Sequence, residues 1–144
     1  MDKNLVILIA EDDEDDRLLI QEAFTEQNVT NPIQFVENGA ELVDYLVRCS
    51  DNPTTTKNPA IIILDINMPK MNGIEALERV KTHPELRPIP VVMLTTSASP
   101  EHVSKSYQLG ANSFLKKPNS YQRMMKLVEL INICWLEIPY RRAS

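Results

Sequence analysis

The sequence predicts an α/β domain in which helices cover both faces of a parallel β-sheet. Short apolar runs rich in isoleucine, leucine and valine recur along the chain, without the polar–apolar alternation typical of a half-exposed strand. Segments with helical periodicity separate these runs. The expected order of elements is therefore βαβαβαβαβα, which favours a parallel sheet.

The predicted strands are of two kinds. Three are continuous apolar runs that end at polar residues, as expected for strands buried on both faces. Two are shorter candidates of mixed composition. In chain order the predicted strands span residues 5–10, 33–36, 61–64, 91–94 and 113–116.

The predicted helices follow recognisable start signals. The turn at Asn38-Gly39 precedes the second helix, and Gly73 precedes the third. Ser99 supplies a hydroxyl N-cap to the fourth, with Pro100 at its first position. Residues 49–60 form a polar connection that is long for such a fold. The predicted helices span residues 18–26, 40–48, 74–81, 100–109 and 121–135.

Length and composition indicate one domain. A chain of 144 residues with 43% apolar content can bury a core without disulfides or a structural metal. We expect a single domain over residues 1–144, with a core of about 4–135, a short tail at 136–144 and no output domain. Cys49 and Cys134 lie far apart and predict neither a disulfide framework nor a zinc site.

Charge and hydropathy exclude several function classes. The net charge is −5 and the basic residues are scattered, so direct nucleic-acid binding is not expected. The apolar runs are much shorter than the roughly 20 residues that cross a bilayer. The apolar run near the N-terminus continues into carboxylates rather than a cleavage site. We therefore expect a cytoplasmic protein without membrane contact.

Reactive side chains follow four of the predicted strands. In a parallel sheet these strand ends meet at one edge, where ligands bind. Taken singly, an acidic run suits a helix N-terminus, a threonine suits a strand and a lysine suits the surface. Their convergence at equivalent positions favours a functional site. The groups are Glu11-Asp12-Asp13, Asp65, Thr95-Thr96 and Lys117-Pro118.

These groups suit phosphoryl transfer to a carboxylate. Crowding of Glu11, Asp12 and Asp65 would favour a hard divalent cation, and Mg²⁺ is the natural choice. With charge offset by the metal and by Lys117, Asp65 could attack a phosphorus atom in line. Thr95 could hydrogen-bond a phosphoryl oxygen.

At these residues the sequence resembles the receiver domain of two-component response regulators, over nearly the whole chain. The resemblance implies a flavodoxin-like (βα)5 fold with a doubly wound, five-stranded parallel sheet. It also implies that a histidine kinase phosphorylates Asp65 in an Mg²⁺-dependent reaction that drives a conformational change. Glu11 and Asp12 match the acidic pair, Asn67 the residue that offers a backbone carbonyl to the metal, and Thr95 and Lys117 the signalling hydroxyl and lysine.

The loop after Asp65 and the end of the chain narrow the resemblance. They are similar to single-domain regulators partnered with bacterial, especially cyanobacterial, phytochrome kinases. The signs are LDINMPKMNG, LTTS, the long connection before the third strand and CWLE. Phe114 stands where many receivers have tyrosine, and Asn119 where phenylalanine is frequent. By the same resemblance we expect a cis Lys117–Pro118 peptide bond.

Two other functions remain open. A degenerate receiver would act as an interaction module without phosphorylation. A haloacid-dehalogenase-type phosphatase also uses a strand-end aspartate and Mg²⁺, but its second aspartate corresponds here to Asn67, which cannot transfer protons. We therefore expect no enzyme in the usual sense, only self-catalysed phosphotransfer and autodephosphorylation.

The final helix carries more apolar residues than one buried face needs. A stripe at steps of three and four is expected to pack on the sheet. A second row of Leu130, Ile133 and Leu136 lies beside it and predicts a homodimer or partner contact through this helix and the tail. The stripe comprises Met124, Leu127, Val128, Ile131, Cys134, Trp135 and Ile138.

Overall fold

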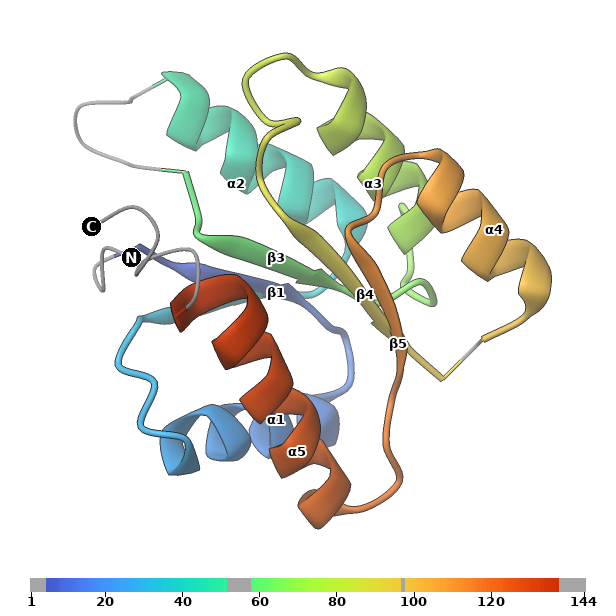
Figure 1. Cartoon of the computed structure of the whole chain (residues 1–144). Coiled ribbons are helices and arrows are strands. Elements are labelled where there is room, and N and C mark those ends of the chain that lie inside the picture. The colour runs from blue at the N-terminus through green and yellow to red at the C-terminus, as the bar shows by residue number, and fades with distance from the viewer. Residues whose placement is uncertain (1–4, 52–57, 97, 138–144) are drawn as a thin grey trace.

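The chain folds around a parallel sheet, as predicted (Figure 1). The computed structural model describes residues 5–51, 58–96 and 98–137. Within these ranges the sheet has five strands in the order β2-β1-β3-β4-β5, and every adjacent pair is parallel. The strands are β1 Ile7–Ala10, β2 Ile33–Val36, β3 Ile61–Leu64, β4 Val91–Thr95 and β5 Ser113–Lys116.

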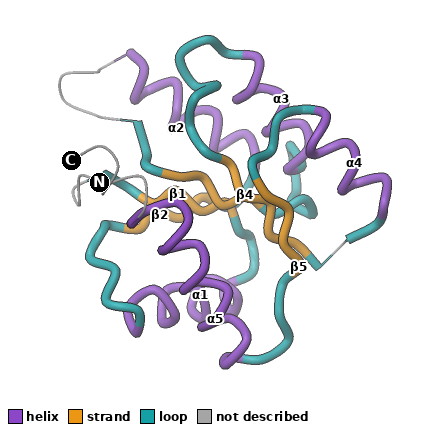
Figure 2. Tube along the Cα trace, in the orientation of Figure 1, coloured by secondary structure: helices purple, strands orange, loops and turns teal. Residues whose placement is uncertain are grey.

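Helices lie on both faces of the sheet (Figures 1 and 2). Helices α1 and α5 pack side by side on one face, and α2, α3 and α4 lie on the other. Each helix follows one strand along the chain, which confirms the doubly wound arrangement. The helices are α1 Glu14–Glu26, α2 Gly39–Asp51, α3 Gly73–Thr82, α4 Pro100–Gln108 and α5 Tyr121–Ile131.

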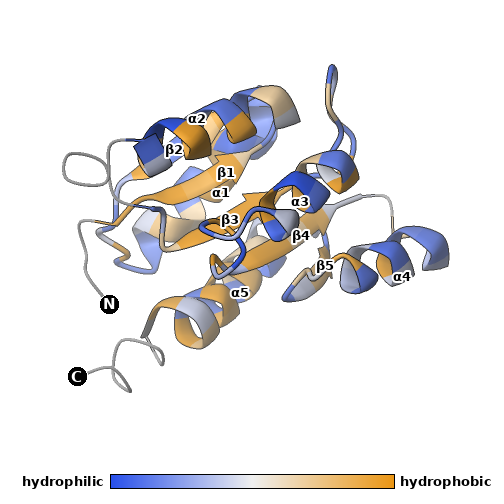
Figure 3. Cartoon of the chain, turned by 90° about the horizontal axis from the view of Figure 1, so that it is seen from above, coloured by the Kyte–Doolittle hydropathy of each residue, from blue (hydrophilic) through white to orange (hydrophobic). Residues whose placement is uncertain are grey.

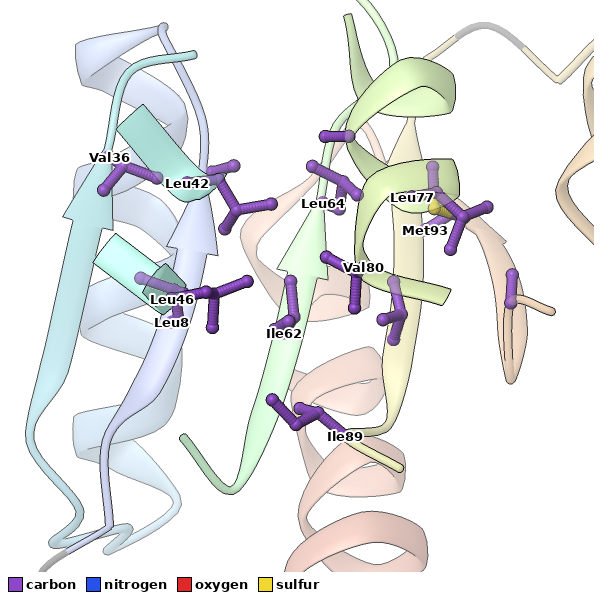
Figure 4. Packing of buried hydrophobic residues seen from close by; sticks show 14 of the residues in the cluster. Leu8, Val36, Leu42, Leu46, Ile62, Leu64, Leu77, Val80, Ile89 and Met93 are labelled. Atoms are coloured by element: carbon purple, nitrogen blue, oxygen red, sulfur yellow. The ribbon is translucent and has the colours of Figure 1, made fainter. Parts of the chain in front are cut away.

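The sheet separates two apolar cores, which explains the continuous apolar runs. Successive residues of a strand point to opposite faces, so a strand covered on both sides needs apolar residues throughout. Leu8, Ile62 and Met93 pack with α2 and α3 (Figure 4), whereas Ile9 and Ile63 pack with α1 and α5. Figure 3 shows the same pattern, with hydrophobic colour concentrated along the central strands.

Helix α1 begins earlier than its apolar periodicity predicts, at Glu14 instead of residue 18. Asp13 is its N-cap, and Oδ1 of Asp13 accepts hydrogen bonds from the amides of Asp15 (2.8 Å) and Asp16 (3.2 Å). Acidic residues occupy the first turn, where the helix dipole favours negative charge. The acidic run therefore supplies both a strand end and a helix start.

The end of α5 departs from the expected pattern because the helix changes type. A π-helical segment, η1 (Asn132–Glu137), continues α5. Its wider turn shifts the phase of the side chains. Cys134, expected on the buried stripe, is exposed, and Leu136, expected in the tail, is buried in the core. Ile138 lies outside the described residues.

The strand order brings β1 and β3 together at the centre of the sheet, although β2 lies between them in the sequence. The direction of strand addition reverses at this point, and α/β sheets bind ligands beyond the carboxyl ends of such strands. None of the described helices is long and apolar enough to span a membrane.

Candidate functional site

Asp65 is held at the carboxyl end of β3 by the sheet itself. Its amide donates to the carbonyl of Ala10 at the end of β1, with a distance of 3.2 Å. The residue is only 5% exposed. The amide of Asn67 donates to Oδ1 of Asp65 at 3.3 Å. Backbone contacts therefore orient this carboxylate.

The loop after Asp65 folds back onto the strand end. The amide of Gly73 donates to the carbonyl of Ile66 at 2.9 Å, and Asn72 caps α3 by accepting from the amide of Glu75. A Cβ on Gly73 would lie 2.1 Å from the carbonyl oxygen of Asp65. Only glycine permits this close approach, which explains the Gly that ends the loop motif.

Lys117 brings the ends of β1, β3 and β5 together. Its amide donates to the carbonyl of Thr95 at 2.9 Å, which continues the pairing of β5 with β4 and directs the side chain to the site. Its ammonium contacts Oδ2 of Asp65 at 2.9 Å, Oδ2 of Asp16 at 2.8 Å and Oε1 of Glu11. A lysine ammonium has three N–H donors, which match these three carboxylates.

Burial makes the charges of this cluster interdependent. The side chains of Lys117, Asp65 and Glu11 are 8%, 7% and 3% exposed. Burial raises the pKa of Glu11 to about 7, although the Lys117 ammonium opposes this shift. Burial lowers the pKa of Lys117, but its hydrogen bonds to the carboxylates outweigh that effect and raise it overall. The ammonium is therefore the charge that stabilises the cluster.

Three of the acidic groups could share one cation. Ligand atoms of Glu11, Asp12 and Asp65 all lie within 4.8 Å of one another. Asp12 is exposed while the other two are buried, so the group opens to solvent on one side. Carboxylate oxygens are the donors that Mg²⁺ and similar hard cations prefer. The donor set thus fits the predicted metal, and the carbonyl of Asn67 stays a predicted fourth ligand.

The structure places Thr95 at the carboxyl end of β4, where it is fully buried. Thr96, the neighbouring hydroxyl at this strand end, is exposed. All the strand ends that were predicted to form the site therefore reach the same edge of the sheet.

Asp16 contacts the site, although the site residues predicted at this strand end stop at Asp13. It lies in the first turn of α1, and its carboxylate reaches Lys117 across 101 positions of sequence. The N-cap at Asp13 could have indicated the position of Asp16. A helix that starts at Glu14 places Asp16 in its first turn, close to the end of β1. Nearby, Nη1 of Arg17 donates to the carbonyl of Glu11 at 3.0 Å.

Two details in and just after β5 bear on the expectations that came from the family resemblance. The expected cis Lys117–Pro118 bond is wrong, since the described residues contain no cis peptide bond. Trans is the lower-energy isomer even before proline. The amide of Phe114 donates to the hydroxyl of Tyr107 on α4 at 3.0 Å. A tyrosine hydroxyl thus contacts β5 from α4, whereas position 114 itself lacks one.

The chain belongs to the response regulator receiver domain family, whose model it matches over residues 7–129. It is 34% identical to Response regulator Rcp1 of Synechocystis sp. over 132 residues, which cover 92% of this chain and 89% of Rcp1. Members of this family act in signalling by accepting a phosphoryl group.

Solved structures of phytochrome response regulators resemble this chain in fold. The Mn²⁺-bound form of Rcp1 has a TM-score of 0.83 at 34% identity and covers 93% of this chain and 96% of its own. Phosphorylated RcpA, a cyanobacterial phytochrome response regulator, has a TM-score of 0.84 at 33% identity and covers 93% and 95%. The bacteriophytochrome response regulator RtBRR has a TM-score of 0.74 at 38% identity and covers 93% and 81%.

The charge balance around Lys117 makes a prediction about stability. Lys117→Met should lower the free energy of unfolding in EDTA by about 3–5 kcal/mol, because it leaves buried carboxylates unpaired. Saturating Mg²⁺ should restore much of the loss by offsetting the same charges. Urea unfolding with and without Mg²⁺ measures both effects. Lys116→Met, at an exposed neighbour, is the matched control. Equal stability of the two variants in EDTA would contradict the prediction.

Proposed function

We propose that this chain receives a phosphoryl group on Asp65 in a Mg²⁺-dependent reaction and signals through the conformational change that follows. The observation that carries the proposal is the setting of Asp65. Its carboxylate is almost fully buried, contacts the Lys117 ammonium, and lies within the carboxylate group that could hold a cation. A carboxylate that only ended a strand would face solvent and would need neither neighbour.

The described residues supply the groups for in-line transfer from a phosphohistidine. An oxygen of Asp65 forms the new bond to phosphorus, the P–N bond breaks, and its electron pair remains on the imidazole. Lys117 offsets charge on a phosphoryl oxygen, and the hydroxyl of Thr95 donates to another. Bound Mg²⁺, held by Glu11, Asp12, Asp65 and the carbonyl of Asn67, would offset the remaining negative charge.

The chemistry is confined to the chain's own phosphorylation and dephosphorylation. Asn67 lies two residues after Asp65 and cannot act as a general acid or base, which disfavours turnover of a separate substrate. We therefore propose that the protein is a phosphoacceptor that assists its own phosphorylation, and not a phosphatase that acts on a separate substrate.

Labelling with acetyl phosphate tests the assignment of Asp65. Wild type should gain the mass of one phosphoryl group in the presence of Mg²⁺, and Asp65→Asn should gain none, because the nucleophile is lost while its volume is nearly kept. Intact mass spectrometry detects the label, and circular dichroism checks the fold. Asp44→Asn, which alters an exposed carboxylate on α2, should be labelled like wild type.

Excess EDTA should abolish labelling of wild type, since the carboxylates would then repel the incoming phosphate. Undiminished labelling in EDTA would refute the role of the metal. Labelling of Asp65→Asn would refute the acceptor unless the label mapped to Asp12 or Asp13. A folded wild type that binds Mg²⁺ but takes no label would be a degenerate receiver.

The proposed phosphoryl donor is a histidine kinase of the phytochrome type. Similarity to RcpA and RtBRR along most of the chain supports this choice. Purified bacteriophytochrome kinases should transfer phosphate to this chain at least about 10-fold faster than histidine kinases without a photoreceptor, because partner surfaces discriminate by several contacts. Transfer followed by radiolabel at equal kinase concentration measures the ratio. A ratio near one would argue against a phytochrome partner.

We further propose that the chain forms a homodimer through α5 and the segment that follows. Leu130 is 60% exposed and Ile133 is 36% exposed, so two large apolar side chains that are three residues apart are open to solvent. Leu130 lies on α5 and lines an open groove of about 430 Å³ with other apolar residues, among them Leu127 and Trp135. Ile133 follows on η1. Leu136, which the sequence placed in the same row, is buried and belongs to the core.

Sedimentation over a concentration series tests the dimer. Wild type should sediment as a dimer at high concentration. Ile133→Lys should shift this equilibrium toward monomer, because it places a charge in the proposed interface. Leu18→Lys is the control, because Leu18 is equally apolar and 59% exposed but lies on α1. Circular dichroism confirms folding of both variants. A wild type that stays monomeric at the highest concentration would rule the dimer out.

A further inference from the structure

We propose that Asp16 is a positioning residue for phosphotransfer, acting by holding the Lys117 ammonium in place. The inference rests on the roles proposed above for Asp65 and Lys117. It concerns a residue outside the set that the sequence predicted, and a direct contact carries it. Oδ2 of Asp16 lies 2.8 Å from Nζ of Lys117.

Asp16 differs from the other two carboxylates that contact Lys117. Glu11 and Asp65 also belong to the group whose ligand atoms could share a cation, and Asp16 does not. When a metal and a phosphoryl group enter the site, the oxygens of Glu11 and Asp65 acquire new partners. Of the three acceptors, Asp16 alone has no part in that exchange.

Lys117 has three N–H donors, and their number limits how its contacts can change when a phosphoryl group binds. In the present structure its N–H groups serve three carboxylates. When Asp65 carries the phosphoryl group, one donor must turn to a phosphoryl oxygen. A retained bond to Asp16 keeps the ammonium near that oxygen, whereas the long lysine side chain otherwise gains rotamer freedom. Catalytic contacts depend strongly on such positioning.

The first turn of α1 holds the backbone of Asp16 in place for its contact with Lys117. Its amide donates to the N-cap Asp13 at 3.2 Å. The next residue, Arg17, reaches back to the carbonyl of Glu11 at 3.0 Å. These bonds tie the helix start to the end of β1, so the Asp16 carboxylate is aimed at Lys117 from a rigid element.

If Asp16 acted only through its negative charge, its removal would change the labelling rate in the opposite direction. A carboxylate that only competed for Lys117 would repel the phosphoryl group, and its removal would accelerate labelling. Asp16 is one-third exposed, so solvent screens its long-range field. The direct hydrogen bond is not screened in this way. We therefore expect loss of Asp16 to slow the reaction.

The experiment compares Asp16→Ala, Asp16→Asn and Asp15→Ala in labelling by acetyl phosphate with Mg²⁺. Asp16→Ala should lower the maximal rate about 10-fold and leave the half-saturating donor concentration within about 2-fold. Asp16→Asn keeps an acceptor and should lose only about 3-fold. Asp15→Ala removes the same charge from the same helix turn at an exposed position, and should behave like wild type.

A double-mutant cycle separates positioning from a structural role. In a Lys117→Ala background, Asp16→Ala should cause no further loss, because the group that it positions is absent. Affinity for beryllofluoride in Mg²⁺, measured by calorimetry, gives a readout without turnover. Asp16→Ala should weaken this affinity several-fold in the wild-type background and leave it unchanged in the Lys117→Ala background.

Several results would overturn the inference. These are faster labelling of Asp16→Ala, an equal effect of Asp15→Ala, or an undiminished effect of Asp16→Ala without Lys117. A wild type that takes no label would overturn the proposed function and this inference together. Normal labelling of wild type and of Asp16→Ala would overturn the role of Asp16 and leave the proposed function intact.

Discussion

The contact of one buried ammonium with three carboxylates is the interaction on which this edge of the sheet depends. Lys117 lies among Glu11 at the end of β1, Asp16 in the first turn of α1 and Asp65 at the end of β3. Buried carboxylates are costly unless paired. The lysine therefore lets acidic groups remain together at low exposure until a cation offsets their charge. Glu11 and Asp65 also belong, with Asp12, to the group that could share a cation.

The apolar cores hold these charged groups in place. Close-packed side chains on both faces of β1 and β3 fix the strands in register, with Ala10 paired to Leu64. Each strand then ends within one residue of a functional carboxylate. The polar chemistry is thus positioned by the packing of buried apolar residues, and a loop with Gly73 closes against the strand end.

One short acidic run performs three physical tasks. Glu11 and Asp12 end the strand and face the site, Asp13 caps the next helix, and Asp16 contacts Lys117 from the first helical turn. The interpretation of this run as a helix start is therefore confirmed, and its role in a functional site stays a prediction. The end of α5, in contrast, does not follow its predicted pattern. The change to π-helical geometry in η1 exposes Cys134 and buries Leu136.

The fold class and most of the candidate site could be predicted from the sequence alone. Strands buried on both faces need apolar residues throughout, so residues 61–64 were recognisable as a strand with their observed bounds. The bounds of the shorter, partly exposed candidates at 33–36 and 113–116 also match β2 and β5. Parallel strands end at one edge, so Asp65 and Lys117 could be expected to meet. Only the tertiary structure decided that Asp16 completes the contacts of Lys117, that Lys117–Pro118 is trans, and which side of η1 is buried. The contact of Asp16 and the buried side of η1 depend on the packing of α1 and α5 against distant strands, which no local periodicity encodes.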